Sequence, residues 1–311
     1  MARKPPALTI ICLVALMAGA QAAHATFAGH PGLIASGQRD GLHVANPDGS
    51  GERVAGDLVS VMTPAWSHDG RRVAVTADTR DSNVDDLNVD IYVIDLTTGE
   101  SRQLTRGAGD DYWPTWGRDD RSIVFQRVST PASDPSAFTK QLFRIRLNGG
   151  HARSLPVKSP YLGGAEVAPK GHTIAFADDG DVFLTGRTGQ GTHKIVDFPD
   201  GDDQPLAGSV SWSPSGRRLA ITAGRNSACY ECADVWTVDR NGSNLHKLTT
   251  TSASYGQAFF RPRGNKVAFC HETWDVAETQ VISEELLLAN LNGTHQKTLG
   301  SFCGTAWQAL P

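Results

Sequence analysis

The hydrophobic and polar positions of the chain alternate in short runs, and these runs recur at a regular spacing. The two clearest copies are residues 64–75, PAWSHDGRRVAV, and residues 114–125, PTWGRDDRSIVF. Weaker copies align with them on one large hydrophobic position, occupied in turn by Trp66, Trp116, Val167, Trp212, Phe260 and Trp307. These positions lie about 45 to 51 residues apart, a period typical of one supersecondary unit repeated in tandem.

Each repeat divides into four predicted strands. The first ends at the large hydrophobic position, and a turn leads to an alternating run such as residues 72–76. A polar loop of variable length precedes a third, more hydrophobic strand, as at 90–95. An Asn-Gly or Gly-Gly turn, as at 241–242, then leads into a short fourth strand. Asn-Gly is a strong hairpin signal because both residues tolerate positive φ. Four antiparallel strands per repeat indicate the blade of a β-propeller.

The two ends of the chain together supply one further blade. Five complete repeats run from about residue 63 to residue 299. Residues 32–54 contain three strands without a first, and residues 304–307 form a first strand with nothing after it. Joining them would pair the edges that an open ring leaves exposed. We therefore predict an all-β fold: a six-bladed propeller with four antiparallel strands per blade, blade one being closed by the C-terminal strand.

The N-terminus has the pattern of a secretory signal peptide. Arg3 and Lys4 precede a hydrophobic run over residues 7–20, and Ala23-His24-Ala25 is an A-x-A cleavage site. The run is shorter than the roughly 20 residues that a membrane span needs. We expect residues 1–25 to be removed and residues 26–311 to form a single propeller domain, exported to the periplasm, cell envelope or medium. A retained N-terminal anchor is the alternative.

Composition restricts the function further. Hydrophobic residues make up 40% and charged residues 20% of the chain, which is typical of a folded globular protein. The net charge of −4 argues against nucleic-acid binding, because nucleic-acid-binding domains are usually basic.

Four segments carry a resemblance to a known repeat. They resemble the TolB-type propeller repeat of exported bacterial proteins, a relative of the WD-type blade. The segments are residues 66–70 (WSHDG), 212–216 (WSPSG), 90–95 (DIYVID) and 234–239 (DVWTVD). The resemblance implies the fold, but such repeats serve binding proteins and the propeller halves of peptidases alike. TolB proper carries a separate domain ahead of its propeller, whereas in this chain the repeats follow the predicted signal directly. We also expect no α/β-hydrolase domain like that of the peptidases.

Motifs that would indicate catalysis or cofactor binding are missing from the sequence. There is no G-x-S-x-G, and His271-Glu272 lacks the second histidine of H-E-x-x-H. The Asp-rich segment 81–90 resembles a calcium loop but lacks its central Gly and closing Glu. We assign no catalytic residue, metal ligand or cofactor, and leave calcium in this segment as an alternative. Glu166, in the inner strand of blade four, is either a functional acid or, as we favour, a hydrogen-bonded structural group.

Four cysteines remain after the signal peptide: Cys229, Cys232, Cys270 and Cys303. An even number in an exported protein favours disulfides. We prefer the pairs Cys229–Cys232 and Cys270–Cys303, the second of which would tie blade six to the closing strand. A redox-active or metal-binding C-x-x-C is the alternative reading of residues 229–232.

The charges divide between the two ends of the ring. The turns between strands one and two and between strands three and four share one end, the turn face, and the first set is rich in Arg and Lys. The other end, the loop face, carries the strand 2–3 loops and the blade-to-blade connections, and its strand 2–3 loops are mainly acidic. The candidate binding residues on the loop face are Asp81, Asp85, Asp86, Asp90, Asp110, Asp111, Asp178, Asp179, Asp181, Glu272 and Asp275.

These features predict a monomeric, exported binding or interaction module rather than an enzyme. Long loops on a rigid scaffold are a common place for binding, and clustered acids would attract a cation or a basic partner. The partner would be a protein or a small ligand held at the loop face. The alternative is a metal-dependent lactonase or lyase that uses carboxylates around the channel axis.

Overall fold

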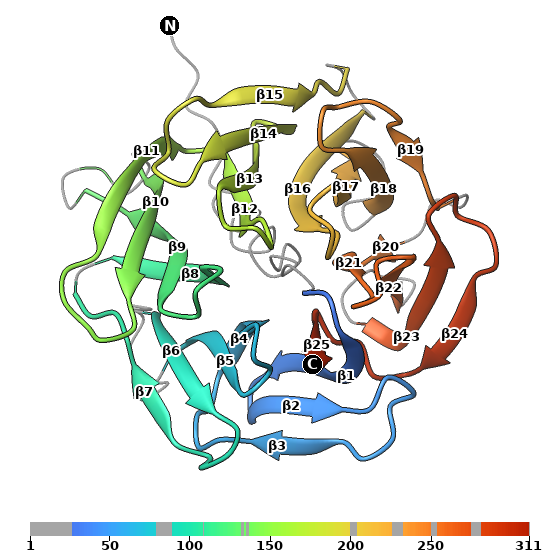
Figure 1. Ribbon diagram of the computed structural model, residues 1–311, viewed down its shortest axis with the longest axis horizontal. Helices are drawn as coiled ribbons and strands as arrows, with labels where there is room; N and C mark the ends of the chain where they lie inside the picture. The colour runs from blue at the N-terminus through green and yellow to red at the C-terminus, as the bar shows by residue number, and fades with distance from the viewer. Residues whose placement is uncertain are drawn as a thin grey trace, which may run out of the picture.

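The strands form a closed ring of blades around a central axis. The computed structural model of the protein describes residues 27–78, 89–107, 109–131, 134, 137–199, 204–225, 233–249, 254–274 and 281–310. Six antiparallel sheets radiate from the axis, and the first strand of each lies innermost (Figure 1). This arrangement confirms the predicted six-bladed all-β propeller.

The strands of the first three blades follow the predicted repeat. From its inner to its outer strand, blade one consists of β25 (Ala306–Leu310), β1 (His30–Gln38), β2 (Gly41–Ala45) and β3 (Arg53–Ala55). In the same order, blade two consists of β4 (Val61–Trp66), β5 (Arg72–Ala77), β6 (Asp90–Asp95) and β7 (Ser101–Gln103). Blade three consists of β8 (Asp110–Trp116), β9 (Ser122–Ser129), β10 (Thr139–Arg146) and β11 (Arg153–Ser159).

The last three blades keep this order, with one interruption. Blade four consists of β12 (Leu162–Val167), β13 (Thr173–Asp178), β14 (Asp181–Gly186) and β15 (His193–Val196). Blade five consists of β16 (Pro205–Trp212), β17 (Arg218–Arg225), β18 (Ala233–Asp239) and β19 (His246–Lys247). Blade six has its inner strand in two pieces, β20 (Ser254–Tyr255) and β21 (Phe259–Phe260), followed by β22 (Lys266–Trp274), β23 (Val281–Asn290) and β24 (Lys297–Gly300).

Blade one is built from both ends of the chain, as predicted. The C-terminal strand β25 pairs antiparallel with β1, and Trp307 lies opposite Ile34 in their register. In Figure 1 the blue strand β1 and the red strand β25 accordingly lie side by side. Strand β25 therefore covers the inner edge of β1, which would otherwise be unpaired.

The tryptophans at the repeated position join neighbouring blades. Trp66, Trp116, Trp212 and Trp307 are all buried. The indole N–H of Trp116 donates to the carbonyl of Ala65 in blade two at 2.8 Å, and that of Trp212 donates to the carbonyl of Glu166 in blade four at 3.1 Å. Trp66 donates in the same way to Ala306 of blade one. The rings of Trp66, Trp116 and Trp212 thus fill space between two blades and also satisfy their one polar atom there. The indole N–H of Trp307 instead donates to Gly32 within blade one.

The remaining three joints between blades use other groups. The hydroxyl of Thr115 accepts the backbone N–H of Val167, which links blades three and four, and Thr222 accepts the N–H of Ala258, which links blades five and six. The disulfide between Cys270 of β22 and Cys303, with a Cα–Cα distance of 5.5 Å, links blade six to the segment before β25. This pairing was predicted. Cys229 and Cys232 lie outside the described residues.

Nothing in the described part of the chain is a helix long and apolar enough to cross a membrane.

Removal of the closing strand should destabilise the whole ring. We expect truncation after Gly304, which deletes β25 but keeps the Cys303 thiol, to abolish cooperative unfolding. The deletion empties the Trp307 site and unpairs the backbone of β1, a loss of at least about 4 kcal/mol. Thermal unfolding followed by circular dichroism measures the effect, and a variant lacking only Pro311 is the control. A truncated protein with the melting temperature of the full chain would disprove closure by β25.

Candidate functional site

The structure spreads the predicted acidic residues over several blades of the loop face. Asp90, Asp110, Asp111, Asp178, Asp179, Asp181 and Glu272 belong to the described residues. Asp81, Asp85, Asp86 and Asp275 lie outside them. Among the described residues, no group of three or more His, Cys, Asp and Glu side chains could hold a metal ion.

Asp90 stabilises the inside of its own blade. Its buried carboxylate accepts hydrogen bonds from the Thr105 hydroxyl at 3.0 Å and the Gln103 amide at 2.8 Å, while Thr105 accepts the backbone N–H of Ile91. Asp234 and Thr249 repeat the carboxylate–hydroxyl bond in blade five, at 2.7 Å. Burial raises the pKa of Asp90. An aspartate at the start of the third strand is therefore a structural part of the repeat.

Asp111 and Asp181 are also engaged within the fold. Asp111 is fully buried, and both its oxygens accept hydrogen bonds from Arg127 at 2.7 Å. Burial raises the pKa of the Asp111 carboxyl, and the charge and hydrogen bonds of Arg127 oppose that rise. Asp181 accepts the backbone N–H of Phe198 at 2.9 Å and forms an ion pair with Lys194 at 2.5 Å. These two carboxylates stabilise the strands on which they lie.

Asp178 and Asp179 remain on the surface at the tight turn between β13 and β14. The turn has positive φ at Asp179 (49°) and Gly180 (85°), and it leaves the Asp179 side chain exposed. Asp178 is half-buried, and its Oδ1 has no hydrogen-bond partner among the described residues. Burial lowers the pKa of nearby Lys140, whereas the charge of Asp178 opposes that shift. This turn therefore presents two carboxylates, of which that of Asp178 lies near the partly buried ammonium of Lys140.

Two further acids of the loop face lie on other blades. Glu272 of β22 lies directly opposite Glu284 of β23 in the strand register, and like charges in such a pair repel each other. Asp110 begins β8 in blade three. The surface carboxylates therefore line the face on different blades instead of meeting at one point.

Glu166 is buried between blades four and five. Its Oε2 accepts the backbone N–H of Trp212, and its Oε1, also buried, has no hydrogen-bond partner within the described residues. Burial raises the pKa of Glu166 well above its usual value, which favours the neutral form of the carboxyl. The bond to the neighbouring blade and the complete burial fit the structural role that we favoured from the sequence.

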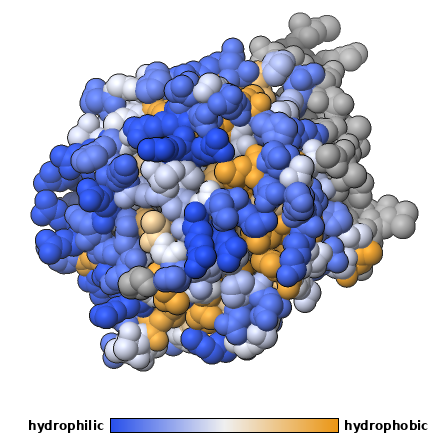
Figure 2. Space-filling model, turned by 45° about the vertical axis from the view of Figure 1, so that its right-hand side comes forward, coloured by the Kyte–Doolittle hydropathy of each residue, from blue (hydrophilic) through white to orange (hydrophobic). Residues whose placement is uncertain are grey.

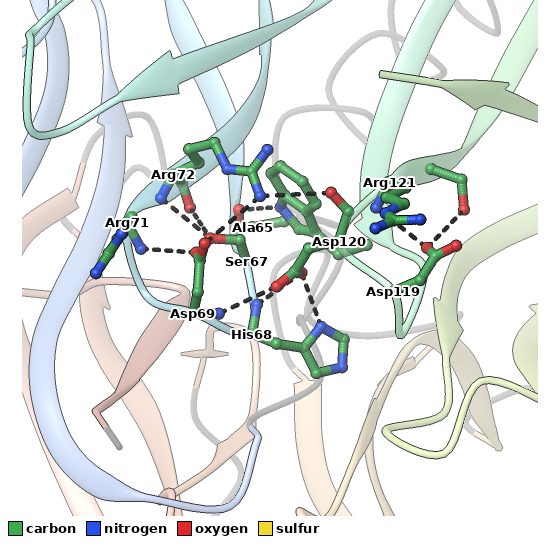
Figure 3. Close-up of polar contacts among 11 residues, drawn as sticks. Ala65, Ser67, His68, Asp69, Arg71, Arg72, Asp119, Asp120 and Arg121 are labelled. Carbon is green, nitrogen blue, oxygen red and sulfur yellow. Dashed lines mark hydrogen bonds and ion pairs between the residues drawn. The ribbon is translucent and has the colours of Figure 1, made fainter. Parts of the chain in front are cut away.

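The turn face contains a network that the sequence analysis did not anticipate (Figure 3). Asp120 of blade three accepts the backbone N–H groups of His68 and Asp69 in blade two, at 2.8 and 3.1 Å, and the His68 imidazole at 2.9 Å. Asp69 in turn accepts the N–H of Arg71 at 3.0 Å. Between blades two and three, the acids of the turns thus bind neighbouring turns and offset their arginines.

A cleft of about 820 Å³ opens on the turn face between blades four and five. Its charged lining includes Lys170, Arg217, Arg218, Asp239 and Arg240. The sequence revealed the basic turns but gave no reason to place a cleft there. In the view of Figure 2 the surface is mostly hydrophilic, with hydrophobic residues in smaller areas between the polar ones.

Comparisons with known proteins agree with this architecture. Residues 42–196 match the TolB β-propeller domain family. The crystal structure of TolB from Acinetobacter baumannii superimposes with a TM-score of 0.66 at 17% identity, over 92% of this chain and 68% of that one. Oligogalacturonate lyase from Vibrio parahaemolyticus has a TM-score of 0.56 at 13% identity, over 91% of this chain and 79% of that one.

A relative from Bacillus subtilis (strain 168) matches by sequence. The uncharacterized peptidase YuxL is 24% identical over 217 residues, which cover 68% of this chain and 29% of YuxL. The chain thus spans less than a third of the length of that relative.

The fold defines a closed six-bladed propeller whose loops and turns offer two differently charged faces. Together with the family match and the TolB superposition, it shows that the chain is a β-propeller of the TolB type.

The buried Glu166 carboxyl should make stability depend on pH. Because folding raises its pKa, the stabilisation is complete below the unfolded-state pKa near 4.5 and is lost as the pH rises towards the folded-state value. We expect the unfolding free energy of the wild type to fall relative to that of Glu166→Gln between pH 5 and pH 8, by about 1 kcal/mol per pH unit until the carboxyl ionises.

Urea unfolding at several pH values measures this difference. The exposed Glu100 supplies the matched control, because the difference between wild type and Glu100→Gln should not change over the same range. A Glu166→Gln difference that stays constant from pH 5 to pH 8 would show that Glu166 is not held neutral.

Proposed function

We propose that the protein is an exported binding module that holds a protein or small ligand, positively charged where it is bound, at its loop face. The observation that carries the proposal is the β13–β14 turn, where the half-buried Asp178 and the exposed Asp179 place two successive carboxylates on the loop face. Neighbouring carboxylates attract a cation through their summed field. An ammonium or guanidinium group of the partner would therefore be drawn to this turn.

The scaffold supports this role. Binding residues are commonly held on loops of a rigid framework, and every joint between the blades of this ring has a hydrogen bond or a disulfide. Glu272 and Asp110 add negative charge to the same face from blades six and three. A partner lying across the axis would contact several of these blades at once.

Export is supported by two independent features. The N-terminal sequence has the charge and hydrophobicity of a signal peptide. The Cys270–Cys303 bond is of a kind that persists in oxidising compartments and is rare in the cytosol.

Neutralising the β13–β14 turn should weaken partner binding and leave the fold intact. The wild-type protein should capture a partner from an envelope extract of the native organism. We expect the double variant Asp178→Asn, Asp179→Asn to capture only a small part of that amount. The loss should match the effect of raising the salt concentration, because the attraction is electrostatic. Quantitative mass spectrometry of the captured proteins and small molecules measures it, and melting temperatures should change little.

The control variant carries the same chemical change on the opposite face. Asp48→Asn with Asp119→Asn removes two turn-face carboxylates and keeps an oxygen that accepts the local backbone N–H bonds. This variant should retain the partner. Retention by the Asp178 and Asp179 variant, with loss by the control, would refute binding at the loop face.

A further inference from the structure

The cleft between blades four and five has an excess of positive charge. Lys170 comes from the turn after β12, Arg217 from the turn after β16 and Arg240 from the turn after β18. Asp239 is the one acidic residue in the described lining. With Arg218 included, four basic side chains therefore face one carboxylate.

The single carboxylate is already neutralised. Asp239 accepts hydrogen bonds from Arg218 Nε at 2.8 Å and from the Asn244 amide at 2.6 Å. The bond from Asn244, followed by the bond and charge of Arg218, lowers the pKa of Asp239. Lys170, Arg217 and Arg240 have no carboxylate within ion-pair distance among the described residues. Their three charges are left for a ligand.

Arg240 is held in place before any ligand arrives. Its guanidinium lies 5.6 Å from the centre of the Trp212 ring, and one of its nitrogens donates to the hydroxyl of Thr173 in blade four at 2.5 Å. Stacking on an aromatic ring and one fixed hydrogen bond reduce the freedom that an arginine side chain loses on binding. Its other N–H groups form the planar fork that matches carboxylate and phosphate oxygens.

The repeat itself distinguishes this joint from the one between blades two and three. The third residue after the large hydrophobic position is Asp69 in blade two and Asp119 in blade three, and each accepts a backbone N–H of its own turn. In blades four and five the same position holds Lys170 and Ser215. The acid that offsets the turn arginines in blades two and three is thus replaced in the two blades that border the cleft, as it is by Arg263 in blade six.

We propose that this cleft binds a small soluble anion carrying two or more phosphate or carboxylate groups. Three unpaired cations call for a multivalent ligand, and a volume of about 820 Å³ lies in the range of small-molecule sites and exceeds the size of a single inorganic ion. The cleft lies on the turn face, opposite the partner site proposed above. The two proposals therefore stand independently of each other.

Calorimetric titration of the full chain with pyrophosphate and with citrate tests the proposal. We expect at least one of these anions to bind the wild type in low salt and to bind more weakly as salt is added. The double variant Lys170→Gln, Arg217→Gln should lose affinity by at least about tenfold, because both side chains are exposed and contribute their charge to the cleft. The two anions distinguish phosphate from carboxylate as the preferred group.

The chain offers a closely matched control. Arg71 and Arg121 occupy the same turn position as Arg217, are exposed on the same face, and lie beside Asp69 and Asp119. The variant Arg71→Gln, Arg121→Gln should keep the wild-type affinity within about twofold. The proposal is overturned if neither anion binds the wild type, if the Lys170 and Arg217 variant binds as well as the wild type, or if the control loses as much affinity as that variant.

Discussion

A propeller is stable only if its blades are attached to one another around the axis, because each sheet contacts little beyond its two neighbours. In this protein five of the six joints have a hydrogen bond between a side chain of one blade and a backbone group of its neighbour, and the sixth has the Cys270–Cys303 disulfide. Tryptophan supplies the hydrogen bond at three joints, through Trp66, Trp116 and Trp212. The large indole fills the space between two diverging sheets. Its N–H donates to the carbonyl of the residue that comes just before the equivalent position in the neighbouring blade. Where the repeat has Val167 or Phe260 in that place, a threonine hydroxyl joins the blades instead.

The same constraint explains why the architecture could be predicted from the sequence. The residue that joins the blades must recur once per blade, so the spacing of Trp66, Trp116 and Trp212 reveals both the repeat and its length. Closure followed from counting strands, because residues 32–54 lacked a first strand and residues 304–307 lacked the rest. The Cys270–Cys303 pair was predictable because the topology brings both residues to one joint.

The roles of individual charges were less predictable, because they depend on partners distant in the sequence. In the sequence Asp90 looks like a binding residue of a surface loop. In the structure it accepts a hydrogen bond from Thr105 within its own blade. Asp111 likewise has a structural role, because Arg127 lies opposite it in the neighbouring strand and donates hydrogen bonds to it. The cleft of the turn face was missed for a related reason: its excess of positive charge depends on which turns of two neighbouring blades lack the aspartate, here at Lys170 and Ser215. A count of basic residues over the whole face hides that local difference.

The construction of blade one has a consequence for the way in which the ring forms. Ile34 and Trp307 are strand neighbours although almost the entire chain separates them in sequence. Contacts of such long range form slowly, since a large loop must close before they bring any gain. Until β25 arrives, the inner edge of β1 can pair with a strand of another chain. The hazard of self-association is therefore set by the lifetime of the unclosed ring rather than by the stability of the finished one.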